Sequence, residues 1–377
     1  MTDLDRSPVG QLVPTVEGAH AFVPSPLPPS LSLPDKLIVK LDRASRAVAT
    51  LDGVGETLEN PLLLVRPFLR REAALSSRIE GTQASVEDVY EFEVAGRSRS
   101  ADALEVANYV AAMELGIELL RELPICARLA HQVHERLLRG VRGRDRRPGL
   151  LRDRQVWIGD DGTPIGEARF VPPPHPRLPE LLTEWERWAN ADNPIPPLVK
   201  AALLHYQFET IHPYLDGNGR LGRLLVILYL ISADVLTTPL LYLSSFFESH
   251  RQAYYDHLLR VSETGDWLPW VEFFLQGAEE QANDALQRSR RLRDLQQRYR
   301  RQLQETRQSA NVIQLTDALF QNPVVTRPSV QRSLTLSQRG AHLVVEKLVE
   351  AGILTELPES RPTVFVAREI LDVVGGR

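Results

Sequence analysis

Apolar and polar positions recur along most of the chain with helical spacing, and this pattern predicts a mainly α fold. Residues 1–35 differ, because their prolines favour an extended arm. Two helices are predicted next, one from Asp35 to Gly53 and one from Pro67 to Gly81, with the proline in the first turn and Gly81 as the C-terminal cap. Further helical patterns occupy residues 86–92, 104–120, 125–138, 178–189, 197–210 and 244–261.

The C-terminal third has a different organisation. Residues 278–308 predict a long, strongly charged helix that crosses from one domain to the next. Helices at 312–320 and 337–351, followed by a strand at 363–366, give an order that resembles a winged helix. We therefore expect an N-terminal arm and helical region at 1–110, a central domain at 111–277, a linker helix at 278–310 and a winged-helix-like domain at 311–377.

Composition is ordinary for a soluble globular protein. Of the 377 residues, 43% are hydrophobic and 25% are charged, and the formal charge of -5 gives no global case for binding nucleic acid or an anionic membrane. The single cysteine, Cys126, excludes an internal disulfide and is typical of a reducing compartment. No secretory signal is visible, and the apolar run at 224–231 is too short to span a bilayer. We expect a cytoplasmic protein with no membrane partner.

The stretch 211–223 combines a polar turn with the start of a helix. Gly217 and Gly219 admit backbone conformations closed to other residues and allow a ligand to come close. Asp216 or Asn218 can cap the first free amides of the helix. The turn is therefore expected to present N–H groups outward, and the apolar run behind it predicts a buried helix that holds the turn rigidly.

Charged residues in this stretch favour an anionic ligand. Arg220 and Arg223 lie on one face of the first helical turn, at the positive end of the helix dipole, where two cations are unfavourable unless an anion joins them. Amides, dipole and two guanidinium groups together suit a polyphosphate. His212 and Asp216 are close enough to supply a base and a carboxylate for Mg²⁺. The alternative is a solvated turn before a core helix, which leaves the combination of polar positions without a reason.

These residues resemble the signature of the Fic family, His-x-Phe-x-Asp/Glu-Gly-Asn-Gly-Arg-x-x-Arg. Every polar position matches, and Tyr214 stands where phenylalanine is usual. The resemblance implies a Fic-type helical bundle that transfers AMP from ATP to a Ser, Thr or Tyr hydroxyl of a target protein and of itself. His212 would be the catalytic base and Asp216 the Mg²⁺ ligand. The ATP phosphates would bind Gly217, Asn218, Gly219, Arg220 and Arg223.

A second resemblance lies at the end of the helix predicted to stop at Gly81. The sequence Ser-Ser-Arg-Ile-Glu-Gly at 76–81 resembles the Fic inhibitory motif Ser/Thr-x-x-x-Glu-Gly/Asn, with Ser76 and Glu80 on one face. The resemblance implies that Glu80 pairs with Arg223 and obstructs the γ-phosphate. The alternative is an exposed glutamate at a helix end. Because both motifs occur in one chain in the expected order, we favour autoinhibition.

Two further regions fit the same family. Residues 155–159 and 167–171 flank an Asp-Asp-Gly sequence and predict a β-hairpin, which looks like the Fic flap, where a target segment could pair by β-augmentation. Without the signature it would be a structural hairpin. Tyr254 and Tyr255 resemble the region near the adenine, although core packing explains them equally well. Glu248 stands where some Fic proteins carry asparagine.

Other polar residues have simpler interpretations. His131 and His134 lack an acidic partner at metal-site spacing, so we expect surface or core histidines rather than metal ligands. The arginine-rich segment from Arg139 to Arg154 predicts a solvated loop or a local field that steers a nucleotide. Its arginines are residues 139, 142, 144, 146, 147, 152 and 154.

Alternative functions remain open at this stage. The same site could remove AMP from a protein, or act as a phosphotransferase. A different class is a DNA-binding regulator in which residues 311–377 bind DNA and the Fic domain senses a nucleotide, although the intact His212 argues against a dead sensor. Arg332, Arg339 and Lys347 could contact DNA phosphates, but such modules also form protein contacts, including homodimers. The sequence favours neither use.

Overall fold

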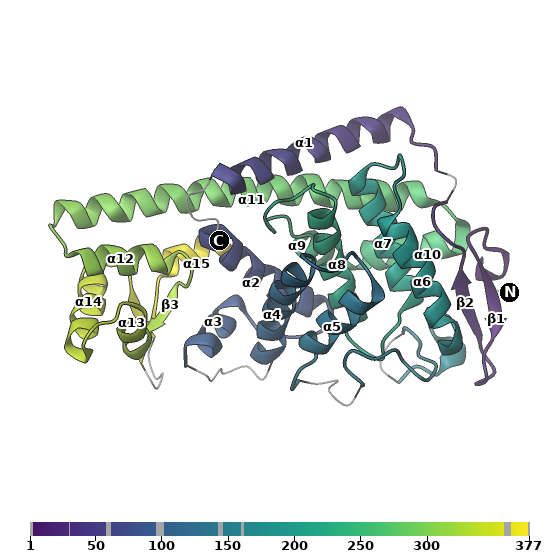
Figure 1. Ribbon diagram of the computed structural model, residues 1–377, viewed down its shortest axis with the longest axis horizontal. Coiled ribbons are helices and arrows are strands. Elements are labelled where there is room, and N and C mark those ends of the chain that lie inside the picture. The colour runs from purple at the N-terminus through teal and green to yellow at the C-terminus, as the bar shows by residue number, and fades with distance from the viewer. Residues whose placement is uncertain are drawn as a thin grey trace. The chain divides into compact units, whose positions relative to one another are not determined.

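The computed structural model describes residues 3–29, 31–57, 62–95, 102–141, 146–159, 162–357 and 363–375, and these residues are mainly helical, as predicted (Figure 1). Two compact units are present. Unit 1 contains residues 1–50, 108–237 and 243–281, and unit 2 contains residues 51–107, 238–242 and 282–377. Within the described ranges, none of the helices combines the length and apolar character needed to cross a membrane.

Unit 1 is built around two adjacent helices, α7 (Pro197–Ile211) and α8 (Asn218–Ser232). Nearly every residue of α8 up to Leu230 is buried, so the predicted core helix behind the polar turn is confirmed. The other helices that lie wholly or partly in this unit are α1 (Asp35–Thr57), α4 (Ala103–Leu119), α5 (Ala127–Leu137), α6 (Leu178–Asn190), α9 (Ser244–Ser249), α10 (Arg251–Thr264) and α11 (Trp267–Glu305), with 3-10 turns at Asp3–Arg6, Ile165–Glu167 and His175–Arg177.

The N-terminal arm contains a β-hairpin that the sequence did not predict. Strand β1 (Gly10–Pro14) pairs antiparallel with β2 (His20–Pro24), and Figure 1 shows the two strands side by side. Phe22 is fully buried, and its N–H donates to the carbonyl of Val171 at 2.8 Å. The arm is extended, as expected, but it folds back on itself and is hydrogen-bonded to the end of the 155–171 segment.

That segment is less regular than the predicted hairpin. Ile158 and Phe170 exchange both backbone hydrogen bonds, at 2.8 and 3.1 Å, but the described residues form no longer ladder there. Pro164 has no N–H for a ladder, and the chain instead forms the 3-10 turn Ile165–Glu167. Residues 155–159 and 162–171 are therefore joined by one antiparallel bridge, and we call them the bridged loop.

Unit 2 combines α2 (Leu62–Ile79) and α3 (Val86–Ala95) with a C-terminal module at residues 310–375. Its three strands form an antiparallel sheet in the order β3-β5-β4. Tyr90 of α3 is fully buried in the hydrophobic core of this sheet, so α3 and the module share one core. The module contains α12 (Ala310–Leu319), β3 (Val324–Thr326), α13 (Arg327–Ser333), α14 (Gln338–Glu350), β4 (Thr355–Leu357), β5 (Val364–Val366) and α15 (Arg368–Gly375).

Several predicted helix boundaries are wrong. α1 continues past the predicted end at Gly53 to Thr57. Near its end a Cβ on Gly55 would lie 2.9 Å from Leu240 Cδ1, so this glycine allows close packing. α2 begins at Leu62, which places Pro67 inside the helix at the loss of one backbone hydrogen bond. The pattern at 244–261 is divided into α9 and α10 at His250, and α11 begins at Trp267 rather than at residue 278, since Trp267 belongs to the buried core.

Candidate functional site

His212 stands at the junction between α7 and the turn that leads to α8. It caps α7 in the left-handed conformation, with φ 49°, and its N–H donates to the carbonyl of Phe208 at 3.0 Å. A non-glycine residue with positive φ is uncommon and marks a constrained position. Nδ1 lies 3.3 Å from the carbonyl oxygen of Glu209. Because a carbonyl only accepts, this contact places a hydrogen on Nδ1, so the lone pair of the neutral ring lies on Nε2.

The polar side chains of the turn fasten the turn itself. Asn218 Oδ1 accepts from the N–H of Tyr214 and Asn218 Nδ2 donates to its carbonyl, both at 2.9 Å. Asp216 Oδ1 accepts from the N–H of Gly217 at 2.6 Å. The N-cap of α8 is Gly217, with φ 77° and no side-chain cap. The expectation that Asp216 or Asn218 caps α8 is therefore wrong. Because no side chain competes for the first amides of α8, an anion can bind them.

Two buried cations follow the turn. The exposed fractions of Arg220 and Arg223 are 4% and 3%, and both belong to the first turns of α8. Asp216 lies on the solvent side, with a side chain that is 42% exposed and an oxygen 3.5 Å from Arg220 Nη2. Burying two guanidinium groups at the positive end of a helix costs free energy unless anions compensate. The two arginines thus add positive charge to the positive end of the α8 dipole, where an anion is favourable.

Arg152 holds the backbone of His212 by a hydrogen bond, a role that the sequence did not indicate. Its exposed fraction is 2%, and burial lowers its pKa to about 10, so it remains charged at neutral pH. Arg152 Nε donates to the carbonyl of His212 at 2.9 Å, and Nη2 donates to that of Pro173, just beyond the bridged loop. The prediction of a solvated or steering arginine is wrong at this position. The signal that could have found it is weak, because Arg152 is one of seven arginines in that segment.

The histidines of α5 contact the signature turn. His131 Nδ1 lies 2.8 Å from the hydroxyl of Tyr214, and the ring of His134 stacks on Tyr214 with centroids 3.8 Å apart. Tyr214 is fully buried, so this hydroxyl needs a partner, and His131 supplies it. His134 is fully buried, and no group of three or more metal-ligating side chains occurs within the described part of the chain. The interpretation of His134 as a core histidine agrees with its burial.

The two tyrosines assigned to the adenine region have different surroundings. Tyr254 is 1% exposed, stacks on Phe247 and lies with its hydroxyl 2.8 Å from His205 Nε2. These contacts agree with the alternative that Tyr254 is a core residue, and its place in the adenine region stays a prediction. Tyr255 is half-buried beneath the guanidinium of Arg251, 5.8 Å from the ring centroid, and stays a prediction.

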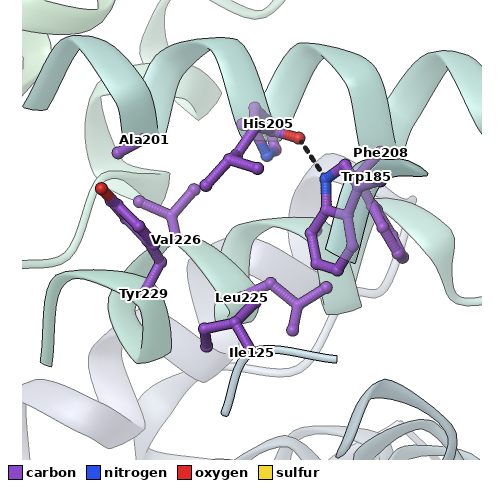
Figure 2. Close-up of a pocket in the computed structure, with 10 residues that line it drawn as sticks. Ile125, Trp185, Ala201, His205, Phe208, Leu225, Val226 and Tyr229 are labelled. Atoms are coloured by element: carbon purple, nitrogen blue, oxygen red, sulfur yellow. Dashed lines mark hydrogen bonds between the residues drawn. The ribbon is translucent and has the colours of Figure 1, made fainter. Parts of the chain in front are cut away.

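A small cavity lies behind α8, between α6, α7 and α8 (Figure 2). Its volume of about 10 Å³ leaves room for about one water molecule. Figure 2 shows Trp185 at its wall, where the indole N–H donates to the carbonyl of Leu204 at 3.1 Å. A nucleotide cannot enter so small a space, so the cavity is a packing feature of the core beneath the turn.

The end of α2 in unit 2 is closed by a Schellman motif. Gly81 adopts φ 92°, its N–H donates to the carbonyl of Arg78 at 3.0 Å, and the N–H of Thr82 donates to that of Ser77 at 3.1 Å. The predicted glycine cap is confirmed. Ser76 is fully buried and Glu80 is exposed, so only the glutamate of this pair is presented at the surface.

Two regions of the sequence match family models. Residues 38–118 match the Fic/DOC family N-terminal model, and residues 124–230 match the Fic/DOC family model. Glu80 falls in the first range and the 211–223 stretch in the second.

Relatives with a similar sequence carry the name protein adenylyltransferase Fic. The protein from Drosophila grimshawi is 28% identical over 257 residues, which cover 64% of this chain and 47% of that protein. The protein from Drosophila mojavensis is 30% identical over 205 residues, which cover 52% of this chain and 37% of that protein. This chain thus spans half or less of the length of these relatives.

Solved structures share the fold. A Fic family protein from Desulfovibrio desulfuricans G20 aligns with a TM-score of 0.60 and 21% identity over 90% of this chain and 98% of its own. A Fic domain containing signalling protein from Bacteroides thetaiotaomicron VPI-5482 aligns with a TM-score of 0.52 and 22% identity over 65% of this chain and 95% of its own.

Proposed function

The chain belongs to the Fic/DOC family over residues 38–118 and 124–230, and we propose that it is an adenylyltransferase that moves AMP from ATP to a Ser, Thr or Tyr hydroxyl of a target protein and of itself. One observation carries the proposal. A histidine whose Nδ1 lies 3.3 Å from a backbone carbonyl stands immediately before a turn whose helix begins without a side-chain cap and with two buried arginines.

The reaction is a displacement at the α-phosphorus. Nε2 of His212 takes the proton of the target hydroxyl, whose oxygen forms a bond to the α-phosphorus, and the bond from this phosphorus to the bridging oxygen of pyrophosphate breaks. The first amides of α8, at Asn218 and Gly219, and the guanidinium groups of Arg220 and Arg223 bind the negative charge that moves onto the leaving group. Few groups suffice, because such chemistry depends on positioning and electrostatics.

Asp216 is the residue that fits Mg²⁺. One carboxylate oxygen accepts from Gly217, and the side chain is 42% exposed, an arrangement suited to a cation that takes one or two protein oxygens and keeps its waters. When bound, Mg²⁺ would neutralise part of the triphosphate charge.

Glu80 is the proposed inhibitor of this site. Its carboxylate follows the last turn of α2, at the negative end of the helix dipole, where a cation is a favourable partner, and we propose that this partner is Arg223. An inhibitory group must be held by a rigid helix, and two ion pairs connect α2 to neighbouring helices. Arg70 binds Glu93 of α3 at 2.6 Å, and Arg71 lies 3.7 Å from Asp284 of α11. With Glu80 in place, ATP would bind in a poor geometry and AMP transfer would be slow.

The bridged loop is the proposed docking edge for the target. Trp157 in this loop is 43% exposed, and Arg152 connects the backbone beyond the loop to that of His212. A target segment paired there would present its hydroxyl toward the base.

For the C-terminal module we retain the prediction of a winged helix, which fits the element order from α12 to β5. DNA binding and homodimer formation by residues 311–377 remain predictions. Lys347 pairs with Glu350, whereas Arg332 and Arg339 are exposed. The cytoplasmic location also remains a prediction.

ATP labelled separately at the α and γ positions tests the function. We expect the purified Glu80→Gly variant to incorporate the α label into itself or into lysate proteins, with an added mass of AMP. His212→Ala in the same background should lose this labelling by about 10²–10⁴-fold, because the base is removed. His342→Ala, at an exposed histidine of α14, is the matched control and should label normally.

The labels also separate the alternatives. Incorporation of the γ label would indicate phosphate transfer, and loss of AMP from a pre-labelled protein without forward labelling would indicate the reverse reaction. Labelling that survives His212→Ala would remove the base assignment.

A further inference from the structure

A buried histidine connects the signature turn to a neighbouring loop. His134 of α5 is fully buried, with its ring stacked on Tyr214 at an interplanar angle of 17°. Its Nδ1 lies 2.9 Å from the backbone nitrogen of Gly149, and its Nε2 lies 2.9 Å from the carbonyl oxygen of Asp216. The imidazole thus spans two backbone segments that are far apart in the sequence.

The two partners fix the protonation of this ring. The N–H of Gly149 can only donate and the carbonyl of Asp216 can only accept, so Nδ1 is bare and Nε2 carries the hydrogen. A second proton on Nδ1 would abolish the bond to Gly149.

The hydrogen bond from His134 to Asp216 lies next to the N-cap of α8. The carbonyl of Asp216 and the N–H of Gly217 belong to one peptide plane, so a bond to the carbonyl restricts the orientation of both. Gly217 is the left-handed N-cap of α8, and a Cβ added to it would lie 3.4 Å from His134 Nε2. The imidazole therefore touches the turn both by hydrogen bond and by packing.

We propose that His134 is a positioning residue for the AMP transfer proposed above: the neutral imidazole holds the Asp216–Gly217 peptide so that the first amides of α8 and the Asp216 carboxylate face the nucleotide phosphates. His134 acts through the turn and touches no reactant. The inference rests on the proposed function for its effect on catalysis, but its effect on the turn is independent of that function.

Three substitutions separate the two hydrogen bonds of the ring. In His134→Gln the amide nitrogen takes the place of Nε2, which keeps the bond to Asp216 and loses the one to Gly149. In His134→Asn the side-chain oxygen takes the place of Nδ1, which keeps the bond to Gly149 and loses the one to Asp216. His134→Phe retains the stack on Tyr214 and loses both bonds. All three are made in the Glu80→Gly parent.

A positioning role predicts that glutamine rescues and asparagine does not. For AMP incorporation we expect kcat/KM of the Gln variant within about fivefold of the parent, the size of one neutral hydrogen bond. The Asn and Phe variants should lose up to about 100-fold, because a small displacement of the phosphate site is costly. Their affinities for Mg-ATP by calorimetry should fall in the same order, although Gln and Asn lose one hydrogen bond each and should have similar melting temperatures.

Hydrogen exchange of the turn without nucleotide gives a readout that needs no activity. Amides in peptides covering residues 213–223 should exchange faster in the Asn and Phe variants than in the parent, and at the parental rate in the Gln variant. Equal exchange and equal kcat/KM in the Gln and Asn variants would overturn the proposal. If the Glu80→Gly parent neither binds Mg-ATP nor incorporates AMP, the proposed function fails, and hydrogen exchange alone decides whether His134 holds the turn.

Discussion

The N-terminus of α8 and the C-terminus of α2 are electrostatic opposites. α8 begins with Arg220 and Arg223 at the positive end of its dipole, and α2 is followed by Glu80 at its negative end. Both ends are shaped by a left-handed glycine, with φ 77° at Gly217 and 92° at Gly81. Each helix end therefore carries the charge that its own dipole disfavours, and each gains from a partner of opposite sign.

Burial distinguishes the two ends. The arginines of α8 are buried within a turn that Asn218, His134 and Arg152 hold in place, so their charge is a fixed part of unit 1. Glu80 is exposed, and moving an exposed charge costs little free energy. The comparison teaches that the proposed anion site is built into a core, whereas the proposed inhibitor is a surface group.

Removing one buried cation should have the largest effect. In the Glu80→Gly background, Arg223→Gln should lower kcat/KM for AMP incorporation by about 10²–10³-fold, because a charge-stabilising donor is lost. Steady-state kinetics with α-labelled ATP measure this. Arg223→Lys keeps the charge but loses the planar fork, so an intermediate loss is expected. Melting curves of both variants control for folding. A folded Arg223→Gln variant with parental kcat/KM would contradict the electrostatic role of this end of α8.

Removing the exposed carboxylate of Glu80 should change the rate of AMP incorporation in the opposite direction and by a smaller factor. Glu80→Gly should raise the initial rate of AMP incorporation by about 5- to 150-fold, the usual range of coupling between sites. Glu80→Gln, which keeps the shape and removes the charge, should raise it in the same direction. Glu122→Gly, at another exposed glutamate just beyond a helix end, is the matched control.

The pairing of the two ends has its own test in the double variant. If Glu80 acts on Arg223, Glu80→Gly brings no further increase once Arg223→Gln is present. An increase of the same size in both backgrounds would mean that Glu80 acts elsewhere or not at all.

Acid should weaken unit 1 through histidines beneath α8. Burial, with the charge of Arg223 acting in the same direction, lowers the pKa of His205 from 6.5 to about 3. The unfolded chain therefore binds a proton that the folded chain does not, so stability is present above pH 6.5 and is lost as pH falls from 6.5 toward 3. The slope is up to about 1.4 kcal/mol per pH unit for each such group. α2 contains no histidine, so it contributes no histidine titration to the loss of stability in acid.

Thermal or urea unfolding between pH 7 and pH 4.5 measures this slope. His205→Gln removes the titrating group and should flatten the curve relative to the parent, whereas His342→Ala, at an exposed histidine, should leave it unchanged. An unaltered slope in His205→Gln would assign the acid sensitivity to other groups.

The smallest effect is expected where the chain departs from the family signature. Tyr214→Phe removes the hydroxyl that lies 2.8 Å from His131 Nδ1 and should lower the free energy of unfolding by about 0.5–1.5 kcal/mol, with AMP transfer nearly unchanged. Urea unfolding measures the cost. Combined with His131→Leu, the two substitutions should cost less than the sum of the single ones, because they remove the same bond. Additive costs would show that the two groups do not interact in solution.

The sequence determined most of the helices and the position of the candidate site in the chain. The spacing of apolar residues indicates α7 and α8, and the polar residues between them are adjacent in the chain, so their grouping needs no tertiary information. The glycine cap after α2 was also predictable, because a left-handed C′ position selects glycine. Local chemistry suffices for features that residues close in sequence make among themselves.

Only the tertiary structure decided which side chains support that site. Arg152, His131 and His134 lie tens of residues before the turn, and their sequence neighbourhoods resemble those of ordinary surface residues. For Tyr254 the sequence left adenine contact and core packing equally open, and the structure shows a ring buried against Phe247. The physical reason is that burial and long-range hydrogen bonds depend on which segments lie together in space. The residues next to such a side chain in a single sequence do not indicate which distant segment it will contact.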